Sequence, residues 1–240
     1  AKIVMNTTEP ITFVTKEDET DECYEEFDYF LFSELEDVRE EMIRIMQDRN
    51  VNLRDRIDKI LQISVSVQRH YDAGSLISWN EFEESDRVCV ENEYELFERL
   101  FLFLFEEFEI LYPQWAEVLV ESRLFLFGEG KKVFEQNKEE FETWWNTSNL
   151  TPLDIVLEQL VVYFISVYLL GAVYDENILG KVDACIGHTI EIYLLLLGRW
   201  LKHGELAMDD VIEVVYRYSR EIEHSDENLE RAEMLNWFAR

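Results

Sequence analysis

Residues 91–112, ENEYELFERLFLFLFEEFEILY, constrain the fold more than any other stretch of the chain. The central FLFLF alternates as a β-strand would, but the window is much longer than the five or six residues or so of a typical strand. Over the whole window the large apolar side chains recur at intervals of three and four residues and fall on one helical face: Leu96, Phe97, Leu100, Phe101, Leu104, Phe105, Phe108 and Leu111. The stretch therefore predicts one long amphipathic helix.

The same helical spacing recurs along most of the chain. It predicts helices over residues 24–47, 53–71, 115–127, 131–145, 151–174, 179–201 and 211–224. After these, either Ser225 caps a last helix or the helix 211–224 continues unbroken through Ser225. Helix breakers are scarce, since 240 residues contain only 8 Gly and 3 Pro. Asn52, Thr151 and Ser225 each precede a predicted helix and are suited to cap its first amides. We therefore expect an all-α protein, a multi-helix bundle of roughly eight or nine helices.

The order of these patterns suggests a domain organisation. Residues 1–22 are expected to form an irregular N-terminal segment, residues 23–72 a helical pair, and residues 73–240 the main helical bundle. The turn-rich stretch DAGSLISWNEFEESD (72–86) supplies the boundary between the pair and the bundle. Alternatively, residues 23–240 form one continuous domain.

The charge balance excludes some partners. Fifty-two acidic and 22 basic residues give a net charge of −30, and such a surface repels phosphate backbones and anionic lipid headgroups. Neither nucleic acid nor a membrane is therefore expected as a partner. The uncharged stretch LVVYFISVYLLGAV (160–173) is shorter than the roughly 20 residues that a membrane span needs, and is expected to be a buried central helix. The sequence leaves the oligomeric state open.

Cysteine and histidine form no metal-binding pattern. Cys23, Cys89 and Cys185 lie far apart without a C-x-x-C pair, which favours a reducing cytoplasm over a disulfide framework. An E-x-x-H motif occurs once, at Glu221–His224, whereas a di-metal carboxylate bundle needs two. We therefore expect no metal site in this chain, although a metal–carboxylate enzyme stays an alternative. Signatures of P-loop, dinucleotide-binding and serine-hydrolase sites are also missing from the sequence.

The predicted helix 211–224 carries the most unusual polar pattern. Its buried stripe is expected to consist of Val211, Val215, Tyr218 and Ile222. A second stripe on the same helix consists of Glu213, Arg217, Arg220 and His224. Two arginines beside a histidine could grip a carboxylate or phosphate. The alternative is an exposed row of ion pairs that joins Glu213 to Arg217 and Arg217 to Glu221.

Two further polar groups interrupt apolar surroundings. Tyr174, Asp175 and Glu176 follow the long apolar helix and could belong to a binding site, or to a polar loop with a buried tyrosine ring. His188 and Glu191 lie within an otherwise apolar helix, where a buried polar pair needs hydrogen-bond partners. For His188 and Glu191 we expect structural hydrogen bonding.

Three stretches are similar to a known family. LEQLVVYFISVYLLGAVYDENILGKV (157–182) and YSREIEHSDENLE (218–230) resemble the C-terminal half of the bacterial flagellin lysine-N-methylase family. DYFLFSELEDVREEMIRIMQDRNVNLRDRI (28–57) resembles the segment that follows the cysteine-rich part of that family. The resemblance runs in order over nearly the whole chain. It implies transfer of methyl groups from S-adenosylmethionine to lysine side chains of flagellin.

The family has an N-terminal cysteine cluster of the C-x-x-C-x-x-x-C-C kind, associated with an iron–sulfur or zinc centre. These 240 residues contain no such cluster. The resemblance therefore implies that this chain is the C-terminal helical part of such a methyltransferase, that it contributes substrate recognition, and that it is inactive alone. The alternative function is a non-catalytic, acidic helical module that docks a basic or helical partner.

The resemblance also suggests roles for the polar residues named above. His224 would accept a proton from the substrate ammonium, because an amine must be neutral to attack a methyl sulfonium. Glu221 or Glu223 would orient the incoming ammonium. Arg217 and Arg220 would hold a carboxylate of cofactor or substrate. Residues expected to complete the binding site are Glu213, Tyr174 and Asp175.

Overall fold

The computed structural model describes residues 7–12, 27–75, 92–234 and 238. Within these residues the chain has nine α-helices of eight or more residues and no β-strand. The helices are α2 (Tyr29–Met46), α3 (Leu53–Asp72), α4 (Glu93–Glu106), α5 (Pro113–Phe127), α6 (Lys131–Thr147), α7 (Leu153–Tyr168), α9 (Ile178–His203), α10 (Met208–Ile222) and α11 (Asp226–Glu233). The expected all-α, multi-helix fold is confirmed. Cys23 and Cys89, like most of residues 1–22, lie outside the described residues.

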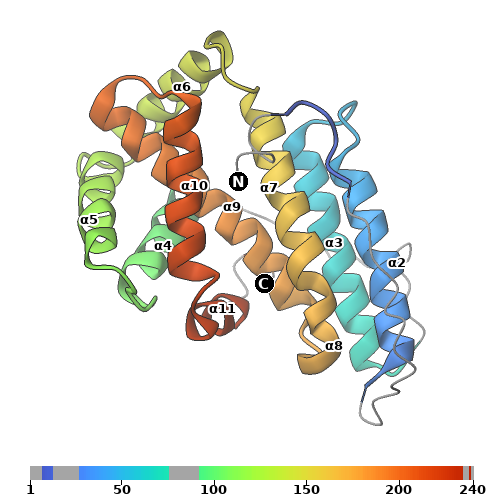
Figure 1. Cartoon of the computed structure of the whole chain (residues 1–240). Helices are drawn as coiled ribbons and strands as arrows, with labels where there is room; N and C mark the ends of the chain where they lie inside the picture. The colour runs from blue at the N-terminus through green and yellow to red at the C-terminus, as the bar shows by residue number, and fades with distance from the viewer. Residues whose placement is uncertain (1–6, 13–26, 76–91, 235–237, 239–240) are drawn as a thin grey trace.

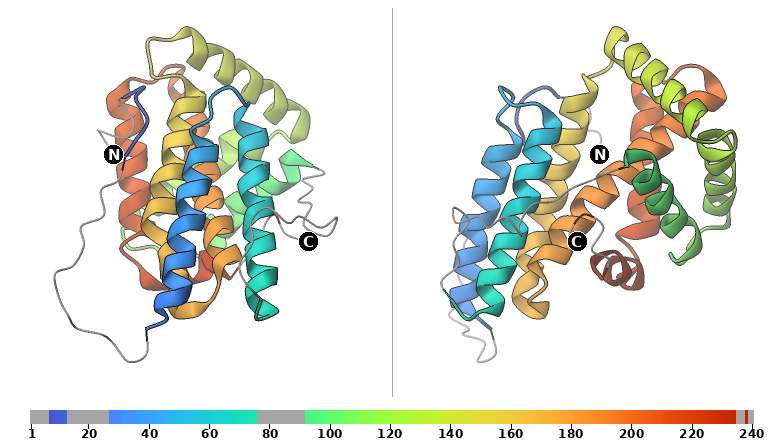
Figure 2. Two further views of the ribbon diagram at one scale, coloured as in Figure 1. Left: turned by 90° about the vertical axis from the view of Figure 1, so that its right-hand side faces the viewer. Right: turned by 180° about the vertical axis from the view of Figure 1, so that it is seen from behind.

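Helix α9 lies at the centre of the molecule. In Figure 1, α2, α3 and α7 run side by side on the right, while α4, α5, α6 and α10 lie on the left, and α9 crosses between the two groups. The view from behind in Figure 2 shows the same division. Helix α9 packs against α3 and α7 on one side and against α4, α5, α6 and α10 on the other. A helix contacted on every side must be apolar all round, as the run IYLLLL (192–197) is.

Two helical stretches have the length and composition of membrane spans. They are Leu153–Asp175 and Ile178–His203, and 56% and 78% of their most apolar windows are buried inside the fold. A central helix of a packed bundle has the same composition. The buried helix predicted for residues 160–173 is confirmed at Leu160, Phe164 and Ile165, whereas Val167 is 47% exposed.

Two of the three predicted helix caps are confirmed. The side chain of Asn52 accepts the amide of Asp55 at 2.9 Å, and that of Ser225 accepts the amide of Asn228 at 3.2 Å. The prediction for Thr151 is wrong, because α7 begins after Pro152 without a side-chain cap. Instead, the indole nitrogen of Trp145 donates to the backbone carbonyl of Thr151 at 2.8 Å, which anchors the α6–α7 turn to the core.

The helix predicted over residues 91–112 is shorter than its pattern. It ends at Glu106, and residues 107–112 form a turn before α5. Side chains from the C-terminal part of the chain explain why α4 ends at Glu106. Asn228 accepts the amide of Glu109 at 2.7 Å, and Glu221 accepts the amide of Leu111 at 2.8 Å. These acceptors satisfy backbone donors that would otherwise have bonded within the helix.

The helix predicted over residues 151–174 is interrupted near its end. After Tyr168 a 3₁₀ turn (Leu169–Gly171) leads into the short helix α8 (Ala172–Asp175). The side chain of Lys181 lies over this turn, and a Cβ atom on Gly171 would stand 3.3 Å from Lys181 Cε. The amine of Lys181 is 2.7 Å from Asp175 and 2.7 Å from Glu233, so the turn is fixed by a buried cation.

A second buried ion cluster joins the α2–α3 turn to α7. The carboxylate of Glu158, 1% exposed, lies 2.7 Å from the guanidinium of Arg56, itself 4% exposed. Arg49 approaches the same carboxylate at 2.8 Å and donates to the backbone carbonyl of Thr8 at 2.7 Å. This arrangement fixes residues 7–12 and the α2–α3 turn against the start of α7.

Candidate functional site

The predicted polar stripe of α10 does not converge on one point. Glu213 and Arg217 pair at 2.6 Å, as expected for an i,i+4 ion pair. The guanidinium of Arg220 instead lies over the ring of Tyr112, 3.9 Å from its centroid. His224 is exposed, and no hydrogen bond joins it to another part of the described chain. The other side of the helix is buried as predicted: Val211, Val215, Tyr218 and Ile222.

The two glutamates at the end of α10 support the fold. Glu221, 3% exposed, accepts the amides of Leu111 and Tyr112, so it does not pair with Arg217 as the alternative reading supposed. Burial raises the pKa of Glu221, and these amides partly offset the rise. Glu223 accepts the hydroxyls of Tyr163 and Tyr168, each at 3.0 Å. Their predicted role toward a substrate ammonium stays a prediction.

The predicted site residues of α8 lie at a different place. Figure 1 shows α8 at the lower end of the three-helix group, across α9 from α10. Tyr174 is 81% exposed, so the buried ring considered for it is wrong. Asp175 pairs with Lys181 at 2.7 Å. The structure therefore brings neither residue to the stripe of α10.

His188 and Glu191 form the expected hydrogen-bonded cluster. The hydroxyl of Tyr218 donates to Glu191, and Nδ1 of His188 lies 2.6 Å from the same hydroxyl oxygen. Because the hydroxyl proton points to the carboxylate, Nδ1 of His188 is assigned as the donor to Tyr218. All three side chains are buried, and burial together with Glu191 raises the pKa of Tyr218. The cluster ties α9 to α10 through polar contacts.

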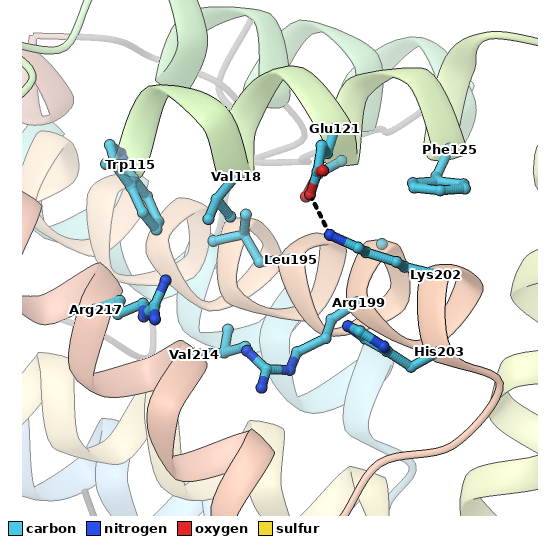
Figure 3. Close-up of a pocket in the computed structure, with 12 residues that line it drawn as sticks. Trp115, Val118, Glu121, Phe125, Leu195, Arg199, Lys202, His203, Val214 and Arg217 are labelled. Carbon is cyan, nitrogen blue, oxygen red and sulfur yellow. Dashed lines mark hydrogen bonds and ion pairs between the residues drawn. The ribbon is translucent and has the colours of Figure 1, made fainter. Parts of the chain in front are cut away.

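Arg217 lines a small cavity between α5, α9 and α10. We call it the cationic pocket, because Arg199, Lys202, His203 and Arg217 line it (Figure 3). Its volume is about 150 Å³. Neither Arg220 nor His224 belongs to its lining. The basic neighbours of Arg217 in this cavity are therefore residues of α9, and not the two residues that the sequence predicted.

A groove of about 670 Å³, larger than the cationic pocket, runs along α9 between the two helix groups. Helices α3, α4, α6, α7 and α9 contribute to it. Its apolar floor consists of Leu53, Ile57, Leu61, Leu96, Phe97, Leu153, Leu157, Ile186, Ile190, Tyr193 and Phe238. Pockets that bind drug-sized ligands occupy about 300–1,000 Å³ and are lined mainly by apolar groups with a few polar ones. The groove meets both conditions.

The charged groups of the groove are mostly acidic. Asp58, Glu93, Glu142 and Asp154 face two cations, Arg54 and Lys138. The Lys138 amine lies 3.3 Å from Glu93 and 3.4 Å from Glu142, and Glu142 accepts the Tyr193 hydroxyl at 2.9 Å. The ring of Tyr193 is in turn held between those of Phe97 and Phe141, with centroids 6.1 and 5.8 Å away. The charged groups on the α4–α6 side of the groove are therefore already paired with one another.

Asp58 differs from the other carboxylates of the groove. It is half-buried, and no hydrogen bond or ion pair within the described chain engages it. Burial raises the pKa of Asp58, and the charge of Arg54 opposes the rise. A partly desolvated carboxylate of this kind gains more from an incoming cation than an exposed one does.

The sequence contained one signal for this residue. Asp58 lies at the edge of the apolar side of a helix, about 60° from Leu61 around the axis, where a carboxylate is less common than on the exposed side. Nothing in the sequence showed which other helices would meet it there. Among the described residues no group of three His, Cys, Asp or Glu side chains could hold a metal ion.

A protein family matches this chain over most of its length. The family model of the FliB lysine N-methylase C-terminal domain matches residues 39–238. The matched range contains every residue that lines the groove and the cationic pocket. No curated protein and no solved structure gives a match.

Proposed function

The chain belongs to the FliB lysine N-methylase C-terminal domain family, and on this premise we propose that it takes part in methyl transfer from S-adenosylmethionine to lysine side chains of flagellin. Its part in the reaction is to receive the substrate lysine in the groove along α9. The observation that carries this proposal is the combination of an apolar floor and unpaired acidic charge in this groove.

A lysine side chain matches that combination. Its four methylene groups are apolar, and its ammonium seeks carboxylates or aromatic faces. The groove offers Leu and Ile side chains along its floor, with four carboxylates against two cations at its edges. The net charge of −30 adds a long-range attraction for a basic substrate segment.

Asp58 is the carboxylate that we assign to the incoming ammonium. Glu93 and Glu142 are already paired with Lys138, and Asp154 is exposed at the start of α7. A lysine must lose a proton before its nitrogen can attack a methyl group, so a nearby acceptor assists the reaction. Burial raises the pKa of Asp58, which makes this carboxylate a better proton acceptor than an ordinary aspartate.

The residues of the groove also fit S-adenosylmethionine. Its adenine would lie on the apolar floor, its ribose hydroxyls would donate to Asp154, and its carboxylate would pair with Arg54. When bound, the cofactor supplies an electrophilic methyl group on a sulfonium. The volume of about 670 Å³ exceeds the needs of a lysine side chain alone, which supports a shared site.

Binding of a flagellin peptide tests the proposal without turnover. Calorimetry would compare a lysine peptide with the same peptide carrying norleucine, which keeps the apolar stem and removes the charge. We expect the lysine peptide to bind about 10-fold more tightly or better, because the norleucine peptide lacks one charge-assisted contact. In Asp58→Asn this preference should disappear, whereas Asp37→Asn, which removes an exposed acid of α2, should keep it.

Two outcomes would contradict the proposal. One is equal binding of the lysine and norleucine peptides by the unaltered chain. The other is the absence of heat with either peptide or with S-adenosylmethionine, while a protein extended at its N-terminus by a cysteine-cluster part binds both. The second outcome would confine the site to the added part.

A second candidate function is a docking module without chemistry. Exposed apolar side chains of α5 favour it: Val120 is 45% exposed, Leu124 67% and Phe125 43%, although Phe125 also lines the cationic pocket. Single exposed apolar residues are normal, and only a contiguous patch marks an interaction surface. The groove is the stronger feature, because it unites concavity, apolar floor and charge.

A further inference from the structure

The cationic pocket gathers basic groups in a protein that has few. The chain has 22 Lys and Arg against 52 acids, yet Arg199, Lys202, His203 and Arg217 line one cavity. Figure 3 shows that the first three come from the last turns of α9 and Arg217 from α10, opposite α5. Glu121 of α5 is the one acid of the lining and pairs with Lys202 at 2.6 Å.

Arg199 and Arg217 each use only part of their guanidinium N–H donors in ion pairs. One terminal nitrogen of Arg199, Nη2, donates to Asp210 at 2.6 Å and to Glu213 at 2.7 Å, and Nη2 of Arg217 donates to Glu213 at 2.6 Å. A guanidinium has five N–H donors, so several remain on each. Among them Nε of Arg199 is buried and has no partner in the described chain. A buried donor without an acceptor destabilises the structure until an acceptor arrives.

Apart from Ser122 and Gly198, the rest of the cavity wall is apolar. Trp115, Val118 and Phe125 come from α5, and Leu195 and Val214 come from α9 and α10 (Figure 3). An apolar cavity of about 150 Å³ is large enough for a benzene-sized molecule, and this pocket has about that volume. A fully polar anion such as phosphate would leave oxygens facing hydrocarbon, which disfavours it.

We propose that the cationic pocket binds a small organic carboxylate with an apolar body. Arg199 and Arg217 hold the carboxylate, and the side chains of α5 cover the apolar part. This site is separate from the groove, because the two linings share no residue. A test of this proposal is therefore independent of any test of methyl transfer.

Benzoate is the probe, and NMR titration of the backbone amides of α5, α9 and α10 is the measurement. We expect saturable binding with a dissociation constant of about 1 mM or below, which is ordinary for so small a ligand. Benzylammonium, of similar size and opposite charge, should not bind, and inorganic phosphate should bind at least about 10-fold more weakly.

Three variants separate the contributions of charge and shape. Arg217→Met should weaken benzoate binding about 10-fold or more, and Val118→Trp should abolish it by filling the cavity while every charge stays. Arg220→Met removes a guanidinium of the same helix that lies over Tyr112, so its binding should equal that of the unaltered protein. The proposal is overturned if benzoate does not saturate, if benzylammonium binds as well, or if Arg217→Met and Val118→Trp bind normally.

Discussion

Replacing Glu158 with leucine is expected to lower the free energy of unfolding by about 3–5 kcal/mol, the usual cost of removing one partner of a buried ion pair. The reason is the guanidinium of Arg56, which is 4% exposed and would lose the carboxylate 2.7 Å away. Arg49 would lose its anchor on α7 in the same step. Urea denaturation followed by circular dichroism gives the difference directly.

A matched control is Glu41→Leu, which breaks an exposed pair with Arg44 on α2. Surface pairs contribute about 0–1 kcal/mol, so this variant should remain close to the unaltered protein. The double variant Glu158→Leu, Arg56→Met should recover much of the loss, because it leaves no buried charge of Arg56 unpaired. Equal stability of Glu158→Leu and Glu41→Leu would show that the buried cluster does not hold the α2–α3 turn to α7.

Filling the groove should abolish most methyl transfer. In a methylase in which a cysteine-cluster part is joined to this chain, Ile190→Trp is expected to slow methylation of flagellin about 100-fold or more. Displacing a substrate by about 1 Å can cost that much, and an indole in the groove would displace the lysine further. The measurement is the rate of labelled methyl incorporation from S-adenosylmethionine.

Ile212→Trp provides the control for this substitution. Ile212 is also half-buried, but it lies on α10 and does not line the groove. Its variant should methylate within about a factor of three of the unaltered enzyme, since changes at separate sites act independently. Equal losses in both variants would attribute the effect to folding, and normal activity in Ile190→Trp would remove the groove from the reaction.

The sequence predicted local structure well because the apolar spacing of each helix is a local property. It placed most helices to within a few residues, and it identified Asn52 and Ser225 as caps. It was wrong where a distant side chain decides the local geometry. The chain leaves the helical pattern after Glu107 because Asn228 accepts the amide of Glu109 and Glu221 accepts those of Leu111 and Tyr112. The apolar spacing of residues 91–112 contains no sign of these contacts.

The site was harder to predict for the same reason. Helical spacing correctly placed Glu213 beside Arg217, but the partners that turn Arg217 toward a cavity lie on α9 and α5. It also grouped Arg220 and His224 with Arg217, although Arg220 lies over Tyr112 and His224 is exposed. The groove draws on five helices, so only the fold could assemble it.

The central claim is that the groove receives the substrate lysine, and photo-crosslinking tests it most directly. A flagellin peptide would carry a photo-activatable lysine analogue at the methylated position, and mass spectrometry would locate the crosslinks. We predict adducts on residues of the groove floor, such as Leu61 of α3 and Ile190 or Tyr193 of α9. Adducts confined to the outer face of α10, around Arg220 and His224, would contradict the claim.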